Sequence, residues 1–112
     1  MSQITTHILD TSLGKPAEGV QISLQEKEGD NWKTIASGIT NSDGRVANLL
    51  ESGKVLVPGI YRMFFETGSY YKKMNTKTFY PEVGIVFETF DEMHYHVPLL
   101  LNPFGFSTYR GS

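Results

Sequence analysis

Hydrophobic and polar residues alternate with a period of two along much of the chain. In residues 20–26, the apolar side chains of Val20, Ile22 and Leu24 alternate with polar ones. This period is typical of a strand with one face against a core and one face in water. Patterns compatible with strands recur in six further segments: 4–10, 32–40, 59–67, 83–89, 95–101 and 104–110.

Turn-forming residues separate these segments, as in Asn41-Ser42-Asp43-Gly44. Residues 67–75 lack the alternation, and we predict a short helix there. Ser69 would cap this helix, with Tyr70 and Met74 on one side. About seven to eight short strands and one short helix predict an all-β sandwich, forming a single domain over residues 1–112.

Composition narrows the classes of partner. Ten basic and twelve acidic residues give a formal net charge of −2, which argues against nucleic acid as a partner. The chain has no cysteine, so no disulfide framework is expected. No segment is apolar and long enough to cross a membrane, and none resembles a signal peptide. We therefore expect a cytoplasmic protein whose partner is a small molecule or another protein.

The outermost strands of a small sandwich need protection from uncontrolled pairing. Pairing of edges across a two-fold axis is one common solution. The last strands are apolar and carry Phe104 and Phe106. This pattern favours an oligomer, although a monomer with covered edges remains an alternative.

Three histidines lie within predicted strands, and two of them share a strand face. His94 and His96 are two residues apart, so they point to the same side. With His7 they form one candidate ligand set for zinc. Pro98, however, is expected to interrupt the strand close by. The metal-free alternative is general acid–base catalysis, for which a pKa near 6.5 is suited, and a purely structural role is a third alternative.

Two further groups could bind or orient a substrate. Arg45 directly follows the turn at residues 41–44, and its planar guanidinium can hold a carbonyl or urea-like group. The chain ends in Tyr109, Arg110, Gly111 and Ser112, which supply donors, a hydroxyl and a carboxylate. This tail either frays or folds back onto the domain.

Three segments carry a resemblance to a known family. They are "THILDTSLGKPAEGVQISL" at 6–24, "TNSDGR" at 40–45 and "HYHVPLLLNPFGFSTYRGS" at 94–112. Together they resemble the transthyretin-like family over essentially the whole chain. The final tetrapeptide is similar to that of the family's hydrolases of purine breakdown, and the hormone carriers of the family lack it.

The resemblance implies a prealbumin-like β-sandwich and a defined activity. That activity is metal-free hydrolysis of 5-hydroxyisourate, a cyclic amide, to 2-oxo-4-hydroxy-4-carboxy-5-ureidoimidazoline in urate degradation. It also implies a homotetramer, a dimer of dimers with sites at the dimer–dimer interface, and no metal or organic cofactor. The alternative is a transthyretin-like carrier that binds a small ligand without catalysis.

The resemblance also assigns roles to residues. The catalytic residues that it implies are His7, Arg45, His96 and Ser112. The substrate-binding residues that it implies are His7, Arg45, Tyr109 and Ser112. The chain departs from the usual family pattern at Asn102, Phe104 and Phe106.

Overall fold

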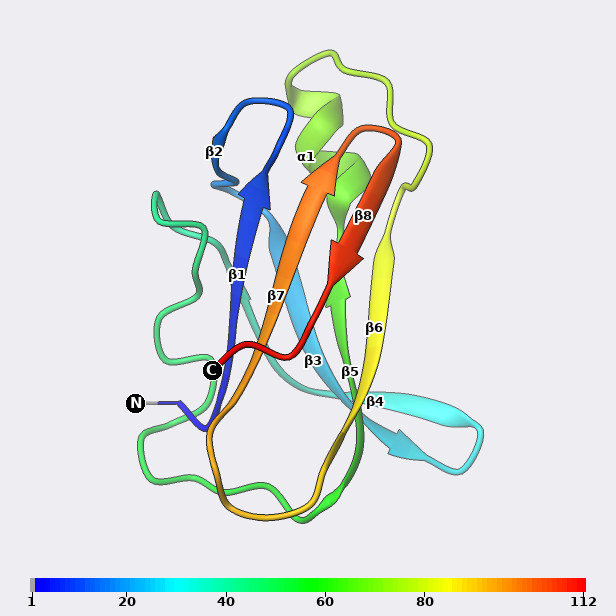
Figure 1. Cartoon of the computed structure of the whole chain (residues 1–112). Helices are drawn as coiled ribbons and strands as arrows, with labels where there is room; N and C mark the ends of the chain where they lie inside the picture. Colours follow the sequence, from blue (N-terminus) through cyan, green and yellow to red (C-terminus); the bar gives the residue numbers. More distant parts are fainter. Residues whose placement is uncertain (1) are drawn as a thin grey trace.

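Two four-stranded sheets pack face to face, with one short helix at one end (Figure 1). The computed structural model describes residues 2–112. The strand orders are β2-β1-β7-β8 in one sheet and β4-β3-β5-β6 in the other. The elements are β1 (Ile4–Asp10), β2 (Lys15–Pro16), β3 (Gln21–Glu28), β4 (Asn31–Ile39), β5 (Gly59–Phe65), α1 (Thr67–Lys73), β6 (Val83–Thr89), β7 (Tyr95–Asn102) and β8 (Gly105–Thr108). This architecture confirms the predicted all-β sandwich.

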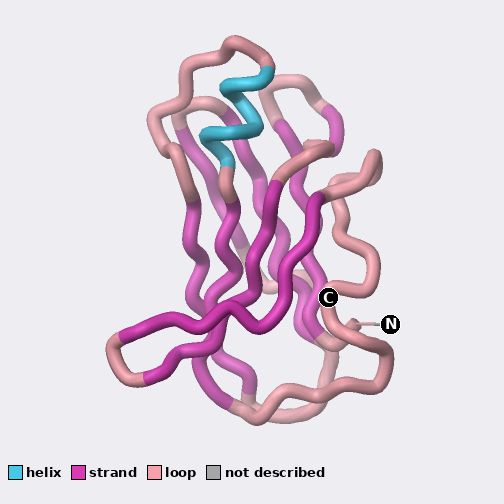
Figure 2. Tube along the Cα trace, turned by 180° about the vertical axis from the view of Figure 1, so that it is seen from behind, coloured by secondary structure: helices cyan, strands magenta, loops and turns pink. Residues whose placement is uncertain are grey.

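Side chains that point between the two sheets form the core. Ile8 and Leu99 come from one sheet, Leu24 and Met63 come from the other, and all four are fully buried. Burial of one such side chain contributes roughly 1.5–3 kcal/mol. Seen from behind, the β3–β4 hairpin extends past the rest of its sheet (Figure 2). The alternation read from the sequence therefore marks the faces that meet.

The two strands that carry the histidines pair in parallel. β1 lies beside β7, with Thr5 opposite His96 and His7 opposite Pro98. Because alternate side chains of β1 enter the core, Thr5 and His7 point away from it. His96 is opposite Thr5 and therefore shares this outer face. The pairing brings the start and the end of the chain together.

Pro98 does not interrupt β7, so the prediction at this position was wrong. It is a buried residue inside the strand. Its carbonyl accepts a hydrogen bond of 2.7 Å from the Thr108 hydroxyl, so its backbone polar groups face β8. β8 ends at Thr108, and the missing N–H of Pro98 therefore leaves no partner unpaired in the ladder.

Helix α1 forms where a helix was predicted, but Ser69 does not cap it. The helix spans Thr67–Lys73, so Ser69 lies inside it. The backbone N–H of Gly68 donates to the carbonyl of Pro81 at 2.7 Å, a tertiary contact that fixes the helix start. Met74 follows the helix and is 38% exposed. Within residues 2–112, no helix is long and apolar enough to cross a membrane.

A buried carboxylate ties the end of β1 to this helix. Asp10 is fully buried, and the Tyr70 hydroxyl donates to its Oδ2 at 2.8 Å. The hydroxyl of Ser12 donates to Oδ1 at 2.5 Å. Burial, followed by the hydrogen bond to Asp10, raises the pKa of Tyr70 and keeps it a donor. The carboxylate therefore has the donors that a buried charge requires.

Candidate active site

Residues from four parts of the chain meet on the outer face of the sheet β2-β1-β7-β8. β1 and β7 supply the histidines, the turn at 41–45 supplies Arg45, and the tail supplies Ser112. In Figure 1 the tail leaves β8, crosses β7 and ends beside β1. The sheet therefore forms a rigid floor, and the turn and the tail form two walls.

The turn that carries Arg45 is held together by Asn41. The side-chain oxygen of Asn41 accepts hydrogen bonds from the backbone N–H groups of Asp43 (2.9 Å) and Arg45 (3.2 Å). The Asn41 N–H donates to the carbonyl of Arg45 at 2.8 Å. Asn and Asp favour such turns because their short side chains bond to the nearby backbone. Arg45 therefore starts from a fixed backbone position.

Gly44 lets this turn dock against β1. Its carbonyl accepts a hydrogen bond of 2.9 Å from the N–H of Ile8. Its φ of +73° is one that other L-residues rarely adopt, and an added Cβ would lie 2.5 Å from the carbonyl oxygen of Ile8. Only glycine fits this close approach.

His7 lies next to Arg45, to which its backbone is bridged. Burial lowers the pKa of His7, and the charge of Arg45 lowers it further. A hydrogen bond to the backbone carbonyl of Asp43 opposes these effects without reversing them. A neutral imidazole, which can accept a proton, is therefore the stable form near neutral pH.

His96 is held by the hydroxyl of Thr5, which lies 2.7 Å from its Nδ1. Burial lowers the pKa of His96, and the nearby charges of Arg45, His94 and His7 lower it further. Arg45 forms no ion pair within residues 2–112, and the charge of Asp43, which raises the pKa of His7, offsets the effect of Arg45 only in part. Both imidazoles are thus kept neutral beside a guanidinium.

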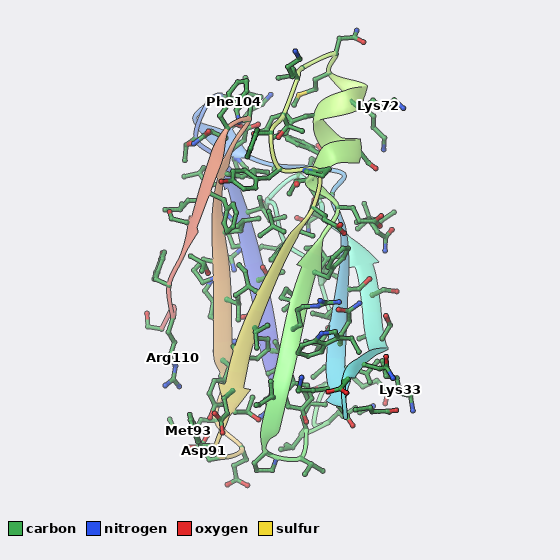
Figure 3. All side chains as sticks on the ribbon, turned by 90° about the vertical axis from the view of Figure 1, so that its right-hand side faces the viewer. Lys33, Lys72, Asp91, Met93, Phe104 and Arg110 are labelled. Atoms are coloured by element: carbon green, nitrogen blue, oxygen red, sulfur yellow. The ribbon has the colours of Figure 1, made fainter. Side chains whose placement is uncertain are left out.

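The C-terminal tail is anchored at two points. The N–H of Gly111 donates to the carbonyl of His96 at 2.9 Å. The guanidinium of Arg110 lies 4.7 Å from the centroid of the Tyr95 ring, whose hydroxyl donates to Asp91 at 2.7 Å. In Figure 3, Arg110 and Asp91 lie toward the same end of the sandwich. These contacts direct Ser112 toward the histidines.

A cavity of about 410 Å³ lies between these groups. Thr5, Arg45, His96 and Ser112 are among its lining residues, together with His94. His7 lies beside this cavity and is not part of its lining. The volume is sufficient for a small heterocyclic molecule.

The structure does not bring Tyr109 to this cavity. Tyr109 and Arg110 instead line a separate groove of about 330 Å³ between the ends of β6 and β7. Tyr109 is 60% exposed there. Within one chain, Tyr109 therefore belongs to the tail and the neighbouring groove.

Sequence reasoning missed Thr5, although a signal for it was present. Thr5 is two residues before His7, and that spacing places both side chains on one face. Asn41 was seen only as a turn residue. The register between β1 and β7, which sets Thr5 opposite His96, has no signal in the sequence.

The three histidines do not form the ligand set that the zinc alternative requires. Within residues 2–112, no three His, Asp or Glu side chains converge in a way that could hold a metal ion. The Thr5 hydroxyl instead occupies one nitrogen each of His94 and His96, at 2.8 and 2.7 Å.

Known proteins resemble this chain over nearly its whole length. The family model described as "HIUase/Transthyretin family" matches residues 4–111. A 5-hydroxyisourate hydrolase of Salmonella dublin is 44% identical over 110 residues, which cover 97% of this chain and 80% of that protein.

Two solved structures show the same fold. Klebsiella pneumoniae 5-hydroxyisourate hydrolase has a TM-score of 0.83 and 40% identity, covering 97% of this chain and 92% of that one. Sea bream transthyretin in complex with thyroxine has a TM-score of 0.90 and 31% identity, covering 98% and 95%. The chain is a member of the HIUase/Transthyretin family.

Proposed function

We propose that this protein is a cyclic amide hydrolase that opens the six-membered ring of 5-hydroxyisourate in urate degradation. The product would be 2-oxo-4-hydroxy-4-carboxy-5-ureidoimidazoline. The observation that carries the proposal is the meeting of His7, Arg45, His96 and Ser112 on one sheet face. The activity named for the Salmonella and Klebsiella relatives supports the choice of substrate.

In the proposed reaction, water attacks the C6 carbonyl of the substrate and the N1–C6 bond breaks. His7 and His96 take a proton from the attacking water and return one to the leaving N1. Their lowered pKa values favour the neutral form that this first step needs. No proton is gained or lost by the enzyme over the cycle.

Arg45 and Ser112 would bind and orient the substrate. The Arg45 guanidinium lines the cavity and can stabilise negative charge on the C6 oxygen as water adds. The hydroxyl of Ser112 can hydrogen-bond to water or substrate at the same cavity. We assign Tyr109 and Arg110 to shaping the tail, and no metal or organic cofactor enters the proposed reaction.

A carrier that binds a small ligand without catalysis is the second candidate. The fold does not separate the two, because the transthyretin structure matches with a higher TM-score than the hydrolase. The site favours the hydrolase. Binding alone has no need for two imidazoles whose pKa values are lowered beside a guanidinium.

We further propose that the active form is a homotetramer, a dimer of dimers. β6 and β8 are the edge strands on the same side of the sandwich. They expose the apolar side chains of Val86 (57%) and Phe106 (40%), as pairing with a second copy would require. A second dimer packed on the outer face would close the cavity. A cytoplasmic location stays a prediction.

The decisive experiment adds purified protein to freshly generated 5-hydroxyisourate and follows its ultraviolet absorbance. The substrate decays unaided, so the rate with enzyme is compared with the rate without it. We expect faster decay with the native chain and a rate close to background with His96→Asn. Decay unchanged by the native chain, together with measurable ligand binding, would favour the carrier.

A further inference from the structure

The hydroxyl of Thr5 lies between two imidazoles. Its Oγ1 is 2.7 Å from Nδ1 of His96 and 2.8 Å from Nε2 of His94. The two rings are roughly stacked, with centroids 6.3 Å apart and an angle of 26° between their planes. The β1–β7 register, which sets Thr5 opposite His96, produces this arrangement.

A hydroxyl carries one proton, so Thr5 can donate to only one of these rings. From the other ring, or from both rings through its two lone pairs, it can only accept. If His96 presents Nδ1–H to Thr5, then Thr5 donates to an unprotonated Nε2 of His94. If His94 presents Nε2–H, then Thr5 donates to an unprotonated Nδ1 of His96. At most one of the two nitrogens that face Thr5 can therefore be unprotonated, which couples the tautomers of the two neutral rings.

Contacts on both edges of the His96 ring fix its orientation. Thr5 holds the Nδ1 edge. Gly111 lies against the opposite edge, where an added Cβ would be nearest to Cδ2 and only 3.0 Å from Cγ. No group of residues 2–112 hydrogen-bonds to Nε2, which is therefore the nitrogen that remains for water or substrate. The tautomer decides whether this atom is a base or a donor.

The nearby positive charge selects between the two tautomers. The Arg45 guanidinium lines the same cavity as His96. A cation is better accommodated beside a lone pair than beside an N–H donor, which favours an unprotonated Nε2. His94 is exposed, so its own Nδ1–H can be hydrated while its Nε2 accepts from Thr5.

We propose that Thr5 and His94 are positioning residues that hold His96 in the Nδ1–H tautomer, leaving Nε2 free to accept the proton of the attacking water. The catalytic meaning of this arrangement rests on the proposed hydrolase function. The assignment of the His96 tautomer does not depend on that function, because the tautomer is a property of the protein without substrate. His94 therefore helps to determine which nitrogen of His96 carries the proton, and this role needs no contact with the substrate.

The test combines nitrogen NMR of histidine-labelled protein with kinetics. The native chain should show a protonated Nδ1 and an unprotonated Nε2 at His96 when the ring is neutral. Thr5→Val keeps the shape and removes the hydroxyl, so both tautomers should appear. Loss of one hydrogen bond predicts a kcat lowered about 5- to 10-fold with KM nearly unchanged. Thr5→Ser should restore both the single tautomer and kcat.

A donor-only side chain at position 94 gives an independent check. His94→Lys removes the acceptor at position 94, so the Thr5 proton can turn to Nδ1 of His96, and the share of the Nε2–H tautomer of His96 should rise. A native His96 that already carries Nε2–H, or a tautomer unaffected by Thr5→Val, would overturn the proposal. The expected tautomers without any hydrolysis would instead refute the proposed function and leave the tautomer assignment standing.

Discussion

The backbone N–H of Gly111 donates a hydrogen bond of 2.9 Å to the carbonyl of His96. This bond holds the tail against the strand that carries a candidate catalytic histidine. It also brings residue 111 so close to the imidazole that no side chain fits between them. The position of Ser112 at the cavity therefore depends on a glycine that takes no part in the chemistry.

Gly111→Ala is expected to impair hydrolysis without unfolding the protein. The added Cβ would collide with the His96 ring and displace either the ring or the tail. A displacement of about 1 Å in an active site can cost on the order of 10²-fold in rate. Gly105→Ala is the matched control, because its Cβ would meet only ordinary contacts 3.7 Å or more away. Equal activity of the two variants would contradict the tail geometry.

His7→Asn and His96→Asn should each lower kcat by about 10²- to 10⁴-fold, the usual contribution of general acid–base catalysis. Both side chains lie on the outer face, so the core stays intact. Circular dichroism and thermal melting should therefore match the native chain. Near-native kcat in both variants would refute the acid–base assignment.

The enzyme should lose hydrolytic activity only at acid pH. A protonated imidazole cannot accept a proton, so kcat/KM falls as the pH drops through the pKa of the essential histidine. Because the pKa values of His7 and His96 are both lowered, the midpoint of this fall should lie below the ordinary histidine value of about 6.5. The dependence of kcat/KM on pH measures it, and an acid limb with its midpoint above that value would contradict the structure.

Arg45→Gln should raise the pKa values of both histidines, because the charge of Arg45 lowers each of them. NMR titration of the imidazole C–H protons without substrate measures this shift directly. Arg62→Gln is the control, since Arg62 stacks on Trp32 in the opposite sheet. Similar titration curves for Arg45→Gln and the native chain would show that the guanidinium does not act on the histidines.

Tyr70→Phe should destabilise the fold and leave the chemistry unchanged. It removes a donor from the buried carboxylate of Asp10, and a hydrogen bond to a charged group contributes about 1.5–3 kcal/mol. Denaturant unfolding should show this loss, with kcat within twofold of native. Tyr80→Phe, on a partly exposed ring, is the control. A stability equal to that of the control would mean that Asp10 finds another donor.

Much of the fold was predictable because its causes are local. The alternation around Ile22 and Leu24 follows from the pleat of a half-buried strand, and the structure places both in the core. The start of α1 was not predictable from Ser69, because the contact of Gly68 with Pro81 sets it. Pro98 was misjudged because its tolerance depends on where a neighbouring strand ends.

The candidate site likewise has a part that was predictable from the sequence and a part that was not. The turn at 41–45 was visible because Asn41 and Gly44 carry its chemistry locally. The link between Thr5 and His96 was not, since it depends on the register of strands about ninety residues apart. The residue types indicated which side chains could act in the site, whereas the pairing of distant strands decided which of these side chains are in contact.

The parallel pairing of β1 with β7 has a consequence for folding during synthesis. During synthesis the first strand emerges from the ribosome long before its partner, and closure of so long a loop is slow. Ile4 and Ile8 therefore stay without their β7 partners until residues 95–102 have been synthesised. The outer face that carries both His7 and His96 can therefore form only after β7 has been made, and a chain that stops before residue 95 would lack it.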